Sequence, residues 1–576
     1  MIIKMCGIWA FIDLCKKSNV DMGKLYSDFM SMKGRGPDMS IFQTIKNTTI
    51  GFHRLAIMDP TFHANQPYII EDNERTIVFL CNGEIYNFKE LVKNHSLNMT
   101  NNSDCMTIPL LYIKYSQSEF NKLFDNEIKG EFAFILFEYD KFQNVRKIVS
   151  GRDQIGVRPL YIGLNDLSIS FSSEIKGLKN FNGKVSEFQP GHISCIYLDD
   201  FGQIQSNDIY HFRNVYKIIP SSHLNEETIL TSVRNSVINS IKRRLTADRP
   251  IAFLLSGGVD SSLVAALSAK ILGQPIRTFC CGMSEGTDLL YARKVAKHIG
   301  SIHTEVFFTP QEGLDAIKDV IYTTETWDTT SIRASVGQHL VCKHIGTKTD
   351  ARVVLVGEGP DEVCSSYLFN YYAPNGKSLH DCAVEYVEKI HLFDGRRVDR
   401  NVSCFGLEAR VPLLDPEFIE TYWNIPKEWR RPQYKEIEKY WLRAAFEGLD
   451  ILPEEVRMRK KEAFSDGVSS KEKSWFQHIQ DHIDTQVSDD EFLSETLKDE
   501  FKDCKTKEQY YYKKLFCEYF GKERLSVIPH YWQAKFKQDG TVIDFSQSYE
   551  YSDPSARTLN VYNEDVKDKD NKDKIE

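Results

Sequence analysis

Cys6, in the N-terminal stretch MIIKMCGIWAF, is the first residue of this chain whose type and position could do covalent chemistry. A cysteine thiol can attack an amide, and a cysteine at the start of a chain carries its own α-amine beside the thiol. The reference pKa of that amine is about 7.7 to 8.0, so it can act as a general base without a neighbouring histidine. The alternative is that Cys6 is a small hydrophobe that opens a buried strand.

The chemistry available to Cys6 depends on how the chain begins. With residues 1–5 attached, the Cys6 nitrogen is an amide and cannot act as a base, and removal of Met1 alone would expose Ile2. We therefore expect that translation starts at Met5 and Met5 is then removed, or that residues 1–5 are cleaved as a short leader.

A second reactive stretch is the loop SGGVDSS at 256–262, which follows the apolar run 250–255 and precedes a helical pattern. Backbone amides and the helix dipole at such a loop bind anions, and glycine lets the backbone approach a phosphate closely. The Lys-Ser/Thr ending of a Walker A loop is missing, so transfer of a γ-phosphoryl group is not expected. Asp260 can instead hold a magnesium ion that bridges phosphates. The loop resembles that of enzymes that cleave ATP to AMP and pyrophosphate while activating a carboxylate.

A third stretch, GEGPDE at 357–362, follows the apolar run 352–356. Ligands of open α/β sheets bind at the carboxyl ends of the strands, so these carboxylates are expected near the SGGVDSS loop. Asp361 can share a metal with Asp260, which leaves Glu358 for acid–base work. An ordinary solvated loop is the alternative.

The elements that must position these residues fall into two regions. Up to about residue 200, short apolar runs alternate with turn clusters, which predicts an α+β sandwich with strands at 77–81, 132–138 and 193–197 and helices near 21–33 and 104–117. From residue 228, apolar runs alternate with helical patterns, which predicts an α/β doubly wound parallel sheet. Its expected strands are 250–255, 276–281 and 352–356, and its expected helices are 229–245, 263–272 and 288–299.

The composition is that of a globular chain of 576 residues, with 41% hydrophobic and 27% charged residues. The net charge of −9 gives no basic field for nucleic acid, and no apolar run approaches the roughly 18 residues that span a bilayer. The thirteen cysteines follow no disulfide or zinc spacing, so we expect free thiols and a reducing, cytoplasmic location.

Several stretches of the second region together resemble the synthetase domain of the glutamine-hydrolysing asparagine synthetases. They are LLSGGVDSS, DLLYARKVAKHIGSIH at 288–303, TTETWDTTSIRASVG at 323–337, GEGPDE, GLEARVPLLD at 406–415 and KKEAFSDG at 460–467. The resemblance implies a PP-loop ATP pyrophosphatase-like fold in which ATP adenylates the side chain of aspartate. Ammonia then displaces AMP.

The resemblance also implies roles for single residues. Glu358 would help to form and consume aspartyl-AMP. Asp260 and Asp361 would hold Mg²⁺. Pyrophosphate or aspartate would be bound by Thr330, Arg333 and Glu362. The residues implied for ATP are Leu254, Ser256, Gly257, Gly258, Asp260, Ser261, Ser262, Cys281, Val356, Gly357 and Lys461.

The chain departs from the family pattern at four positions near the nucleotide. Val356 and Pro360 stand where the family usually has serine, and Ser365 and Ser366 stand where it usually has two glycines. Loss of two hydroxyls would weaken phosphate binding, and Pro360 stiffens the loop. The carboxylates assigned to metal binding and acid–base chemistry are retained, so we expect the activity to be retained as well.

The N-terminal region can supply the ammonia by hydrolysing glutamine. Besides a nucleophile, this needs an oxyanion hole, a cation for the α-carboxylate and an anion for the α-ammonium. The Asn82 amide and the Gly83 N–H fit the first need, and the guanidinium of Arg54 fits the second. Asp104, with Glu84 beside it, fits the third. Each residue alone has a structural alternative, as a turn, a surface arginine or a helix cap.

Together with Cys6-Gly7-Ile8, GRGPD, NGEIYN and RDQIGVRPLY, these residues resemble the class II glutamine amidotransferase domain over residues 5–192. The resemblance implies an αββα sandwich of the N-terminal nucleophile hydrolase type. Gly34 and Met106 depart from its pattern, but neither is an assigned reacting group. The implied glutamine site comprises Arg54, Leu55, Ala56, Ile57, Met58, Asn82, Gly83, Glu84 and Asp104.

The predicted organisation is a leader at 1–5, a glutaminase domain at 6–200, a linker at 201–227, a synthetase domain at 228–550 and a disordered tail at 551–576. The substrates would be glutamine, aspartate and ATP, with ammonia passed internally, and the resemblance implies a homodimer. Two alternatives remain open. One is an ammonia-dependent synthetase whose glutaminase is silent, and the other is an inactive regulatory homologue.

Overall fold

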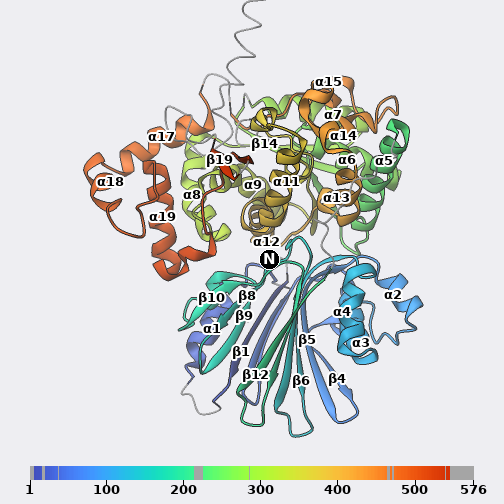
Figure 1. The fold of residues 1–576 in the computed structure, drawn as a ribbon, viewed down its shortest axis with the longest axis vertical. Helices are drawn as coiled ribbons and strands as arrows, with labels where there is room; N and C mark the ends of the chain where they lie inside the picture. The colour runs from blue at the N-terminus through green and yellow to red at the C-terminus, as the bar shows by residue number, and fades with distance from the viewer. Residues whose placement is uncertain are drawn as a thin grey trace, which may run out of the picture.

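The computed structural model describes residues 6–15, 20–36, 38–212, 225–284, 286–462, 467–469, 473–538 and 540–544. These residues form two bodies, one on either side of an extended interface (Figure 1). The predicted leader at 1–5 and the predicted tail at 551–576 lie outside the described residues. None of the helices in the described ranges is long and apolar enough to span a lipid bilayer.

Two six-stranded antiparallel sheets make up the N-terminal body, in the orders β10-β8-β9-β1-β3-β2 and β12-β11-β7-β6-β5-β4. The strands of the first sheet are β1 (Gly7–Asp13), β2 (Met39–Ile45), β3 (Thr48–Arg54), β8 (Tyr161–Leu164), β9 (Ser168–Ser172) and β10 (Lys184–Glu187). Those of the second are β4 (Tyr68–Asp72), β5 (Arg75–Ile85), β6 (Gly130–Tyr139), β7 (Val145–Arg152), β11 (His192–Leu198) and β12 (Ile204–His211).

The central strands are buried on both faces because each sheet lies between the other sheet and a helical layer (Figure 1). In β6, Ala133, Ile135 and Phe137 pack between the sheets, whereas Phe134 and Leu136 contact the helical layer. A strand with two apolar surroundings needs no polar face, which explains the continuous apolar run in FAFILFE. The predicted αββα sandwich is confirmed.

Helix α1 (Met22–Ser31) covers the first sheet, and α2 (Phe88–Asn94), α3 (Thr107–Lys114) and α4 (Gln117–Asn126) cover the second. The expected helices near 21–33 and 104–117 correspond to α1 and to the 3₁₀ turn η2 (Asp104–Met106) followed by α3. Helices α2 and α4 were not expected. The start of α4 does have a sequence signal, because Ser116 and Glu119 form a capping box.

The linker predicted at 201–227 begins too early. Strand β12 lies inside that stretch and pairs with β11, from His192 opposite His211 to Leu198 opposite Ile204. The β-structure of the N-terminal body therefore continues to His211. Residues 213–224 lie outside the described residues, and α5 (Glu226–Arg244) then opens the second body.

The second body is built on a five-stranded parallel sheet in the order β15-β14-β13-β16-β17. Its strands are β13 (Ile251–Leu254), β14 (Arg277–Gly282), β15 (Ile302–Phe307), β16 (Val353–Leu355) and β17 (Glu408–Arg410). Central β13 has β14 on one side and β16 on the other, so the chain leaves it in opposite directions. Such a switch point opens a crevice at the carboxyl ends of the strands.

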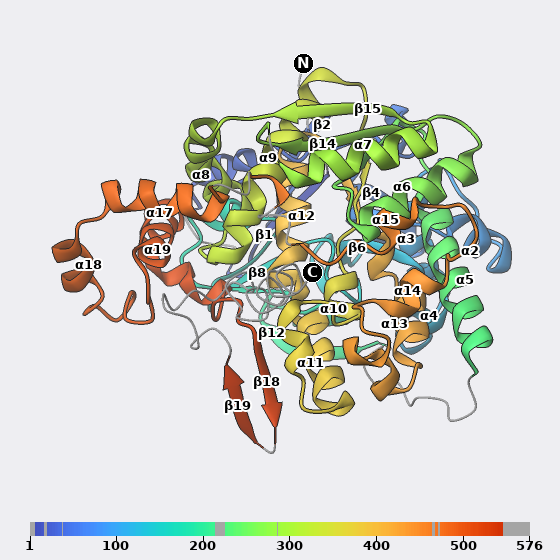
Figure 2. The same ribbon diagram turned by 90° about the horizontal axis from the view of Figure 1, so that it is seen from above.

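Helices cover both faces of this sheet, as predicted (Figure 2). The helices of this body that follow α5 are, in chain order, α6 (Val259–Leu272), α7 (Thr287–Ile299), α8 (Pro310–Thr324), α9 (Thr329–Lys348), α10 (Pro360–Val363), α11 (Gly376–Lys389), α12 (Asp394–Ser403), α13 (Pro416–Trp423), α14 (Tyr440–Ala444) and α15 (Glu454–Arg457). The C-terminal helices α17 (Trp475–Gln486), α18 (Asp489–Glu495) and α19 (Lys507–Phe520) lie to one side. The strands β18 (Lys535–Gln538) and β19 (Thr541–Asp544) pair with each other, and β18 contacts α11.

Candidate active sites

Cys6 lies immediately before β1 and packs against an apolar cluster that contains residues of the second body. Because Gly7 pairs with His53, Cys6 lies beside the end of β3, and its Sγ atom accepts a hydrogen bond from the Leu55 N–H at 3.3 Å. The Leu55 carbonyl lies 3.4 Å from the same Sγ. Burial raises the pKa of the Cys6 thiol to about 12, so the resting group is the neutral thiol.

Asn82 and Gly83 lie on β5, next to the η2 turn. The Asn82 Nδ2 atom is buried and has no hydrogen-bond partner among the described residues. It is therefore available to donate a hydrogen bond to an oxygen of a bound ligand. Gly83 has φ +150°, and a Cβ there would lie 2.2 Å from the Glu131 carbonyl oxygen. Only glycine therefore fits where β5 approaches β6 this closely.

Arg54 and Asp104 are both held firmly. The Arg54 guanidinium donates to the carbonyls of Thr61, at 2.6 Å, and of Asp59. Asp104 Oδ2 accepts from the Ile85 N–H at 2.5 Å, which ties the η2 turn to the end of β5. Burial raises the pKa of Asp104 to about 6, although the hydrogen bond from Ile85 lowers it. The predicted cation therefore lies at the end of β3, and the predicted anion lies at the start of η2.

Glu84 is buried beside Asp104, and its contacts cross to the second body. Burial raises its pKa, and the carboxylates of Asp104 and Glu408 raise it further. Its Oε2 atom lies 3.4 Å from Nη2 of Arg410 on β17. The predicted glutamine site therefore adjoins the interface between the two bodies.

The segment after Arg54 forms the loop that supports Cys6. Leu55, Ala56 and Ile57 are buried, whereas Met58 is half-buried against apolar clusters of both bodies. The Ala56 N–H donates to Asp38 Oδ2 at 2.8 Å, which joins the loop to the GRGPD segment. Of these predicted residues, Leu55 contacts Cys6 through its backbone, and the Ala56 backbone anchors the loop to Asp38.

A cavity opens at the switch point of the parallel sheet. The loop after β13 and the loop after β16 meet there, and a Cβ on Gly357 would lie 2.5 Å from the Ser261 nitrogen. Glycine at 357 thus allows the two loops to touch. The predicted residues that line the cavity are Leu254, Ser256, Gly258, Asp260, Ser261, Cys281, Thr330, Gly357, Glu358, Asp361 and Lys461.

Five predicted residues are not among those that line this cavity in the described part of the chain. Gly257 and Ser262 lie within the loop itself, and Val356 is a buried residue at the end of β16. Arg333 is directed to the Glu508 carboxylate on α19, at 2.9 and 2.7 Å. Glu362 accepts a hydrogen bond from the Tyr367 hydroxyl and lines a neighbouring, smaller pocket instead.

Lys439 is a cavity residue that sequence reasoning missed. Its Nζ atom lies 2.5 Å from Asp260 Oδ2 and 2.5 Å from Asp361 Oδ1. Lys461 contributes a second ammonium, 2.5 Å from Asp361 Oδ2. Burial alone would lower the pKa of Lys439, but the two carboxylates outweigh it and raise that pKa. No motif marks Lys439, which stands at φ +59° just before α14.

Glu358 projects into the cavity between two polar side chains. Gln338 on α9 donates to Oε1 of Glu358 at 3.0 Å, and Arg397 on α12 donates to the same atom at 3.2 Å. The pKa of Glu358 is raised, because burial raises it by more than the neighbouring Arg397 lowers it. Neither Gln338 nor Arg397 was predicted, because the sequence does not reveal which helix faces the acidic loop.

The carboxylates of Asp260 and Asp361 supply two oxygen ligands of the kind that magnesium prefers. The Oδ1 atom of Asp260 is buried and has no hydrogen-bond partner within the described ranges. No group of three or more His, Cys, Asp or Glu side chains in those ranges could hold a metal. Mg²⁺ commonly binds through one or two carboxylates plus phosphate oxygens and water, and these residues fit that mode.

Comparison with known proteins covers nearly the whole chain. The Asparagine synthase family model matches residues 232–384 and 373–538, and the Glutamine amidotransferase domain model matches residues 5–234. A glutamine-hydrolysing asparagine synthetase of Gallus gallus is 38% identical over 97% of this chain and 99% of its own length. That of Homo sapiens is 37% identical over 98% and 100%, and that of Mus musculus 38% over 97% and 99%. This chain therefore belongs to the family of glutamine-hydrolysing asparagine synthetases.

Proposed function

We propose that this chain converts L-aspartate, L-glutamine, ATP and water into L-asparagine, L-glutamate, AMP and diphosphate. The relatives that it matches end to end bear the name of this activity. The observation that carries the proposal is that one chain combines two sets of groups. The N-terminal body holds the Cys6 thiol and the buried Asn82 amide, whose Nδ2 atom has no hydrogen-bond partner among the described residues, and the second body holds a separate cavity at a glycine-rich loop. The first arrangement suits amide hydrolysis, and the second suits a nucleotide.

In the glutaminase reaction, the Cys6 thiol attacks the side-chain carbonyl of glutamine. The α-amine of an N-terminal Cys6 takes the thiol proton and passes it to the leaving ammonia. The pKa of about 12 favours proton removal during the attack over a preformed thiolate. Asn82 Nδ2 and the Gly83 N–H stabilise the oxyanion, Arg54 binds the α-carboxylate and Asp104 the α-ammonium. Water then hydrolyses the thioester to glutamate.

In the synthetase reaction, a carboxylate oxygen of aspartate attacks the α-phosphorus of ATP. Pyrophosphate leaves, and the product is aspartyl-AMP. Lys439 and Lys461 neutralise charge on the departing pyrophosphate, whose phosphates lie against the SGGVDSS loop. Ammonia then attacks the acyl carbon and AMP leaves. Glu358, whose pKa burial raises, accepts the proton that the incoming ammonia loses.

We further propose that Asp260 and Asp361 hold Mg²⁺ together with phosphate oxygens. The ion would supply positive charge against the triphosphate during loss of pyrophosphate. The residues Thr330, Arg333 and Glu362 remain assigned to pyrophosphate or aspartate as a prediction. Of these, Thr330 has the best support, because its buried Oγ1 atom has no partner in the described part of the chain.

The ammonia is proposed to travel inside the protein. One continuous apolar cluster includes Leu55 and Ile57 next to Cys6, and Val356 and Leu414 in the second body. Apolar surroundings disfavour ammonium over neutral ammonia, so such a route keeps the nucleophile unprotonated. We also propose a cytoplasmic location, consistent with thirteen free cysteines, and a homodimer, which sedimentation velocity can test.

The function is tested by measuring aspartate-dependent pyrophosphate release and asparagine formation with either glutamine or ammonium chloride. The proposal expects both nitrogen donors to support the parent protein, and Cys6→Ala to abolish only the glutamine-dependent reaction. If Cys6→Ala changes neither reaction, the protein is an ammonia-dependent synthetase with a silent glutaminase. If pyrophosphate is not released with either donor, the chain is an inactive homologue.

A further inference from the structure

Arg35 connects the backbone of Cys6 to the second body. Its Nε atom donates to the Cys6 carbonyl oxygen at 3.0 Å, and its aliphatic part runs alongside Gly7. A Cβ on Gly7 would lie 3.5 Å from Cδ of Arg35, so the side chain lies against the backbone that carries the nucleophile. The orientation of Cys6 therefore depends on where the Arg35 guanidinium is held.

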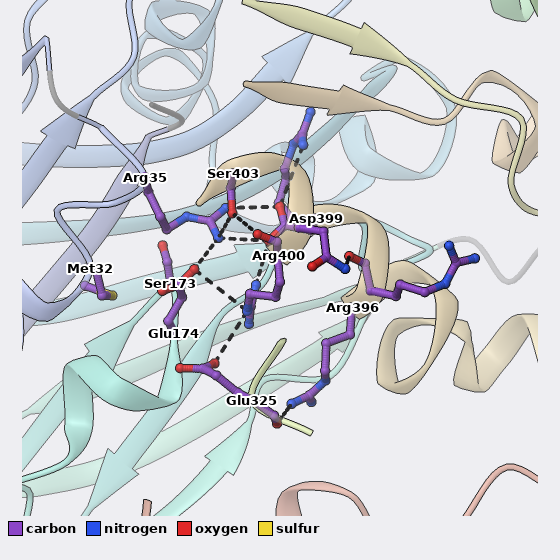
Figure 3. Close-up of polar contacts among 12 residues, drawn as sticks. Met32, Arg35, Ser173, Glu174, Glu325, Arg396, Asp399, Arg400 and Ser403 are labelled. Carbon is purple, nitrogen blue, oxygen red and sulfur yellow. Dashed lines mark hydrogen bonds and ion pairs between the residues drawn. The ribbon is translucent and has the colours of Figure 1, made fainter. Parts of the chain in front are cut away.

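The guanidinium is held chiefly by α12, a helix of the second body. Its Nη1 and Nη2 atoms donate to the two carboxylate oxygens of Asp399 at 2.8 and 3.0 Å. Nη1 also donates to Ser403 Oγ at 3.1 Å, one turn further along α12, and to Glu174 Oε1 at 2.7 Å within its own body. Figure 3 shows Arg35 reaching across to α12 at this junction.

The pair between Arg35 and Asp399 is desolvated and ionised. Their side chains are 1% and 2% exposed. Burial alone would raise the pKa of Asp399, but Arg35 and then Arg400 outweigh it and lower that pKa. A bidentate pair in such surroundings fixes the plane and the position of the guanidinium. Removing only one member of the pair is strongly destabilising, because the charge of the other member stays buried without a counter-charge.

We propose that Asp399, a residue of the synthetase domain, is a positioning residue for glutamine hydrolysis, acting through Arg35 on the Cys6 backbone. The inference rests on the proposed role of Cys6 as the nucleophile. A carbonyl fixed by Arg35 leaves the N–Cα–Cβ unit of Cys6 little freedom, so the amine and the thiol are presented together to the glutamine site. The glutaminase centre is therefore complete only when the second body is docked.

The same helix also contacts the synthetase cavity. Arg397, two residues before Asp399, donates to Glu358 and to Gln338 at 3.2 and 3.1 Å. One rigid helix thus supports the nucleophile of one centre and the acidic loop of the other. Through α12, the position of the glutaminase centre is tied to the position of the synthetase centre.

The test is the Asp399→Asn variant of the full chain, which keeps the side-chain shape and removes the charge. We expect kcat for glutamine hydrolysis to fall about 10- to 100-fold with KM for glutamine nearly unchanged, because the misplaced group is the nucleophile. Ammonia-dependent asparagine synthesis, measured on the same preparation, should stay within about twofold of the parent. That second activity also reports that the variant is folded.

Glu187→Gln is the matched control. Glu187 of the first body pairs with Arg396 on the same helix at 2.7 Å, and this pair is buried to a similar degree but does not contact Cys6. We expect the control to leave kcat for glutamine within about twofold of the parent. Labelling of Cys6 by an electrophilic glutamine analogue, followed by mass spectrometry, should slow in Asp399→Asn and not in Glu187→Gln.

Three outcomes overturn the inference. Asp399→Asn could hydrolyse glutamine at the parental kcat, both variants could lose glutaminase activity equally, or the loss could lie entirely in KM. If Asp399→Asn does not fold, Ser403→Ala takes its place, since it removes one neutral hydrogen bond to Arg35, and a smaller fall in the same kcat is expected. An unchanged kcat in that variant also counts against the inference. The Cys6→Ala variant distinguishes failure of this inference from failure of the proposed function. If it hydrolysed glutamine at the parental rate, Cys6 would not be the nucleophile.

Discussion

The Nζ atom of Lys439 lies 2.5 Å from a carboxylate oxygen of Asp361, on the wall of the cavity at the switch point. The same ammonium touches Asp260, so one lysine bridges the two carboxylates proposed to hold magnesium. Without a nucleotide, it neutralises a pair of acidic groups that would otherwise repel each other. With a nucleotide, the same charge lies close to the phosphates that the loop after β13 binds.

Replacement of Lys439 by methionine keeps the length of the side chain and removes its charge. We expect pyrophosphate release to fall by about 100-fold or more, because a preorganised charge that stabilises the leaving group is lost. Glutamine hydrolysis without aspartate should be unaffected. Both rates can be measured on one preparation, by coupled pyrophosphate and glutamate assays.

Lys435 supplies the control for that variant. It lies four residues earlier, and its ammonium is 3.5 Å from the exposed carboxylate of Glu226. Lys435→Met should retain pyrophosphate release, since an exposed ion pair contributes at most about 1 kcal/mol. A Lys439→Met protein with parental pyrophosphate release would show that the bridge is structural only.

Asp104 predicts a pH dependence for glutamine binding. Burial raises its pKa to about 6, and the carboxylate must be ionised to bind an α-ammonium group. A raised pKa means that the charged form is present above pH 6 and is lost as the pH falls through that value. Between pH 7.5 and 5, affinity for glutamine should therefore fall by about tenfold.

The cleanest measurement of this effect is calorimetric titration of glutamine into the Cys6→Ala protein, which cannot turn the ligand over. Adding Asp104→Asn should weaken binding at pH 7.5 and flatten the dependence on pH. If affinity still falls tenfold in the double variant, another group carries the titration, and Glu84 is the nearest alternative, since it adjoins Asp104 in the buried cluster.

The parts of the glutaminase and synthetase centres that could be predicted are those whose residues are contiguous in the sequence. The SGGVDSS and GEGPDE loops could be placed at one edge of a sheet, because each follows an apolar run that forms a parallel strand. Roles for Cys6, Asn82 and Gly83 could be proposed from their chemistry, and these roles stay predictions. All of these features depend on local order along the chain, which a single sequence shows directly.

Contacts made by tertiary packing could not be predicted. Lys439 reaches the cavity from an unremarkable charged segment, and its partners lie 179 and 78 residues away in the sequence. Arg333 was expected at the nucleotide, but α19 brings Glu508 against it, 175 residues further along. The contact from Arg35 to Asp399 crosses between bodies. In each case the partner is decided by which helix docks where, and no short motif encodes that.

Gly83 gives a prediction about stability. A Cβ at this position would lie 2.2 Å from the Glu131 carbonyl and 2.5 Å from the Phe132 Cα, and neither backbone atom can move without shifting β6. We expect Gly83→Ala to lower the free energy of unfolding by about 2–3 kcal/mol, as overpacking does, and to abolish glutamine hydrolysis. Urea denaturation monitored by fluorescence measures the first effect.

Gly448→Ala separates the clash from backbone strain. Gly448 has φ +68°, and a Cβ there would meet no atom within 4 Å. Its replacement by alanine should lower the free energy of unfolding by only about 1 kcal/mol, because an alanine then has to adopt the left-handed backbone conformation. Both activities should stay intact. Equal destabilisation by the two variants would mean that β5 and β6 relax to accommodate a methyl group.

The last prediction concerns the amine of Cys6. The Cys6 carbonyl is held by Arg35 and its Sγ by Leu55, so the nitrogen is the remaining polar atom of Cys6 that can serve as the base. A preparation that starts at Cys6 should hydrolyse glutamine about 100- to 10,000-fold faster than one that retains residues 1–5, because only the first has a free amine. Intact-mass measurement establishes which form is present, and ammonia-dependent synthesis should be equal in both. If the longer form hydrolyses glutamine at the same rate, the base is another group and the proposed mechanism at Cys6 is wrong.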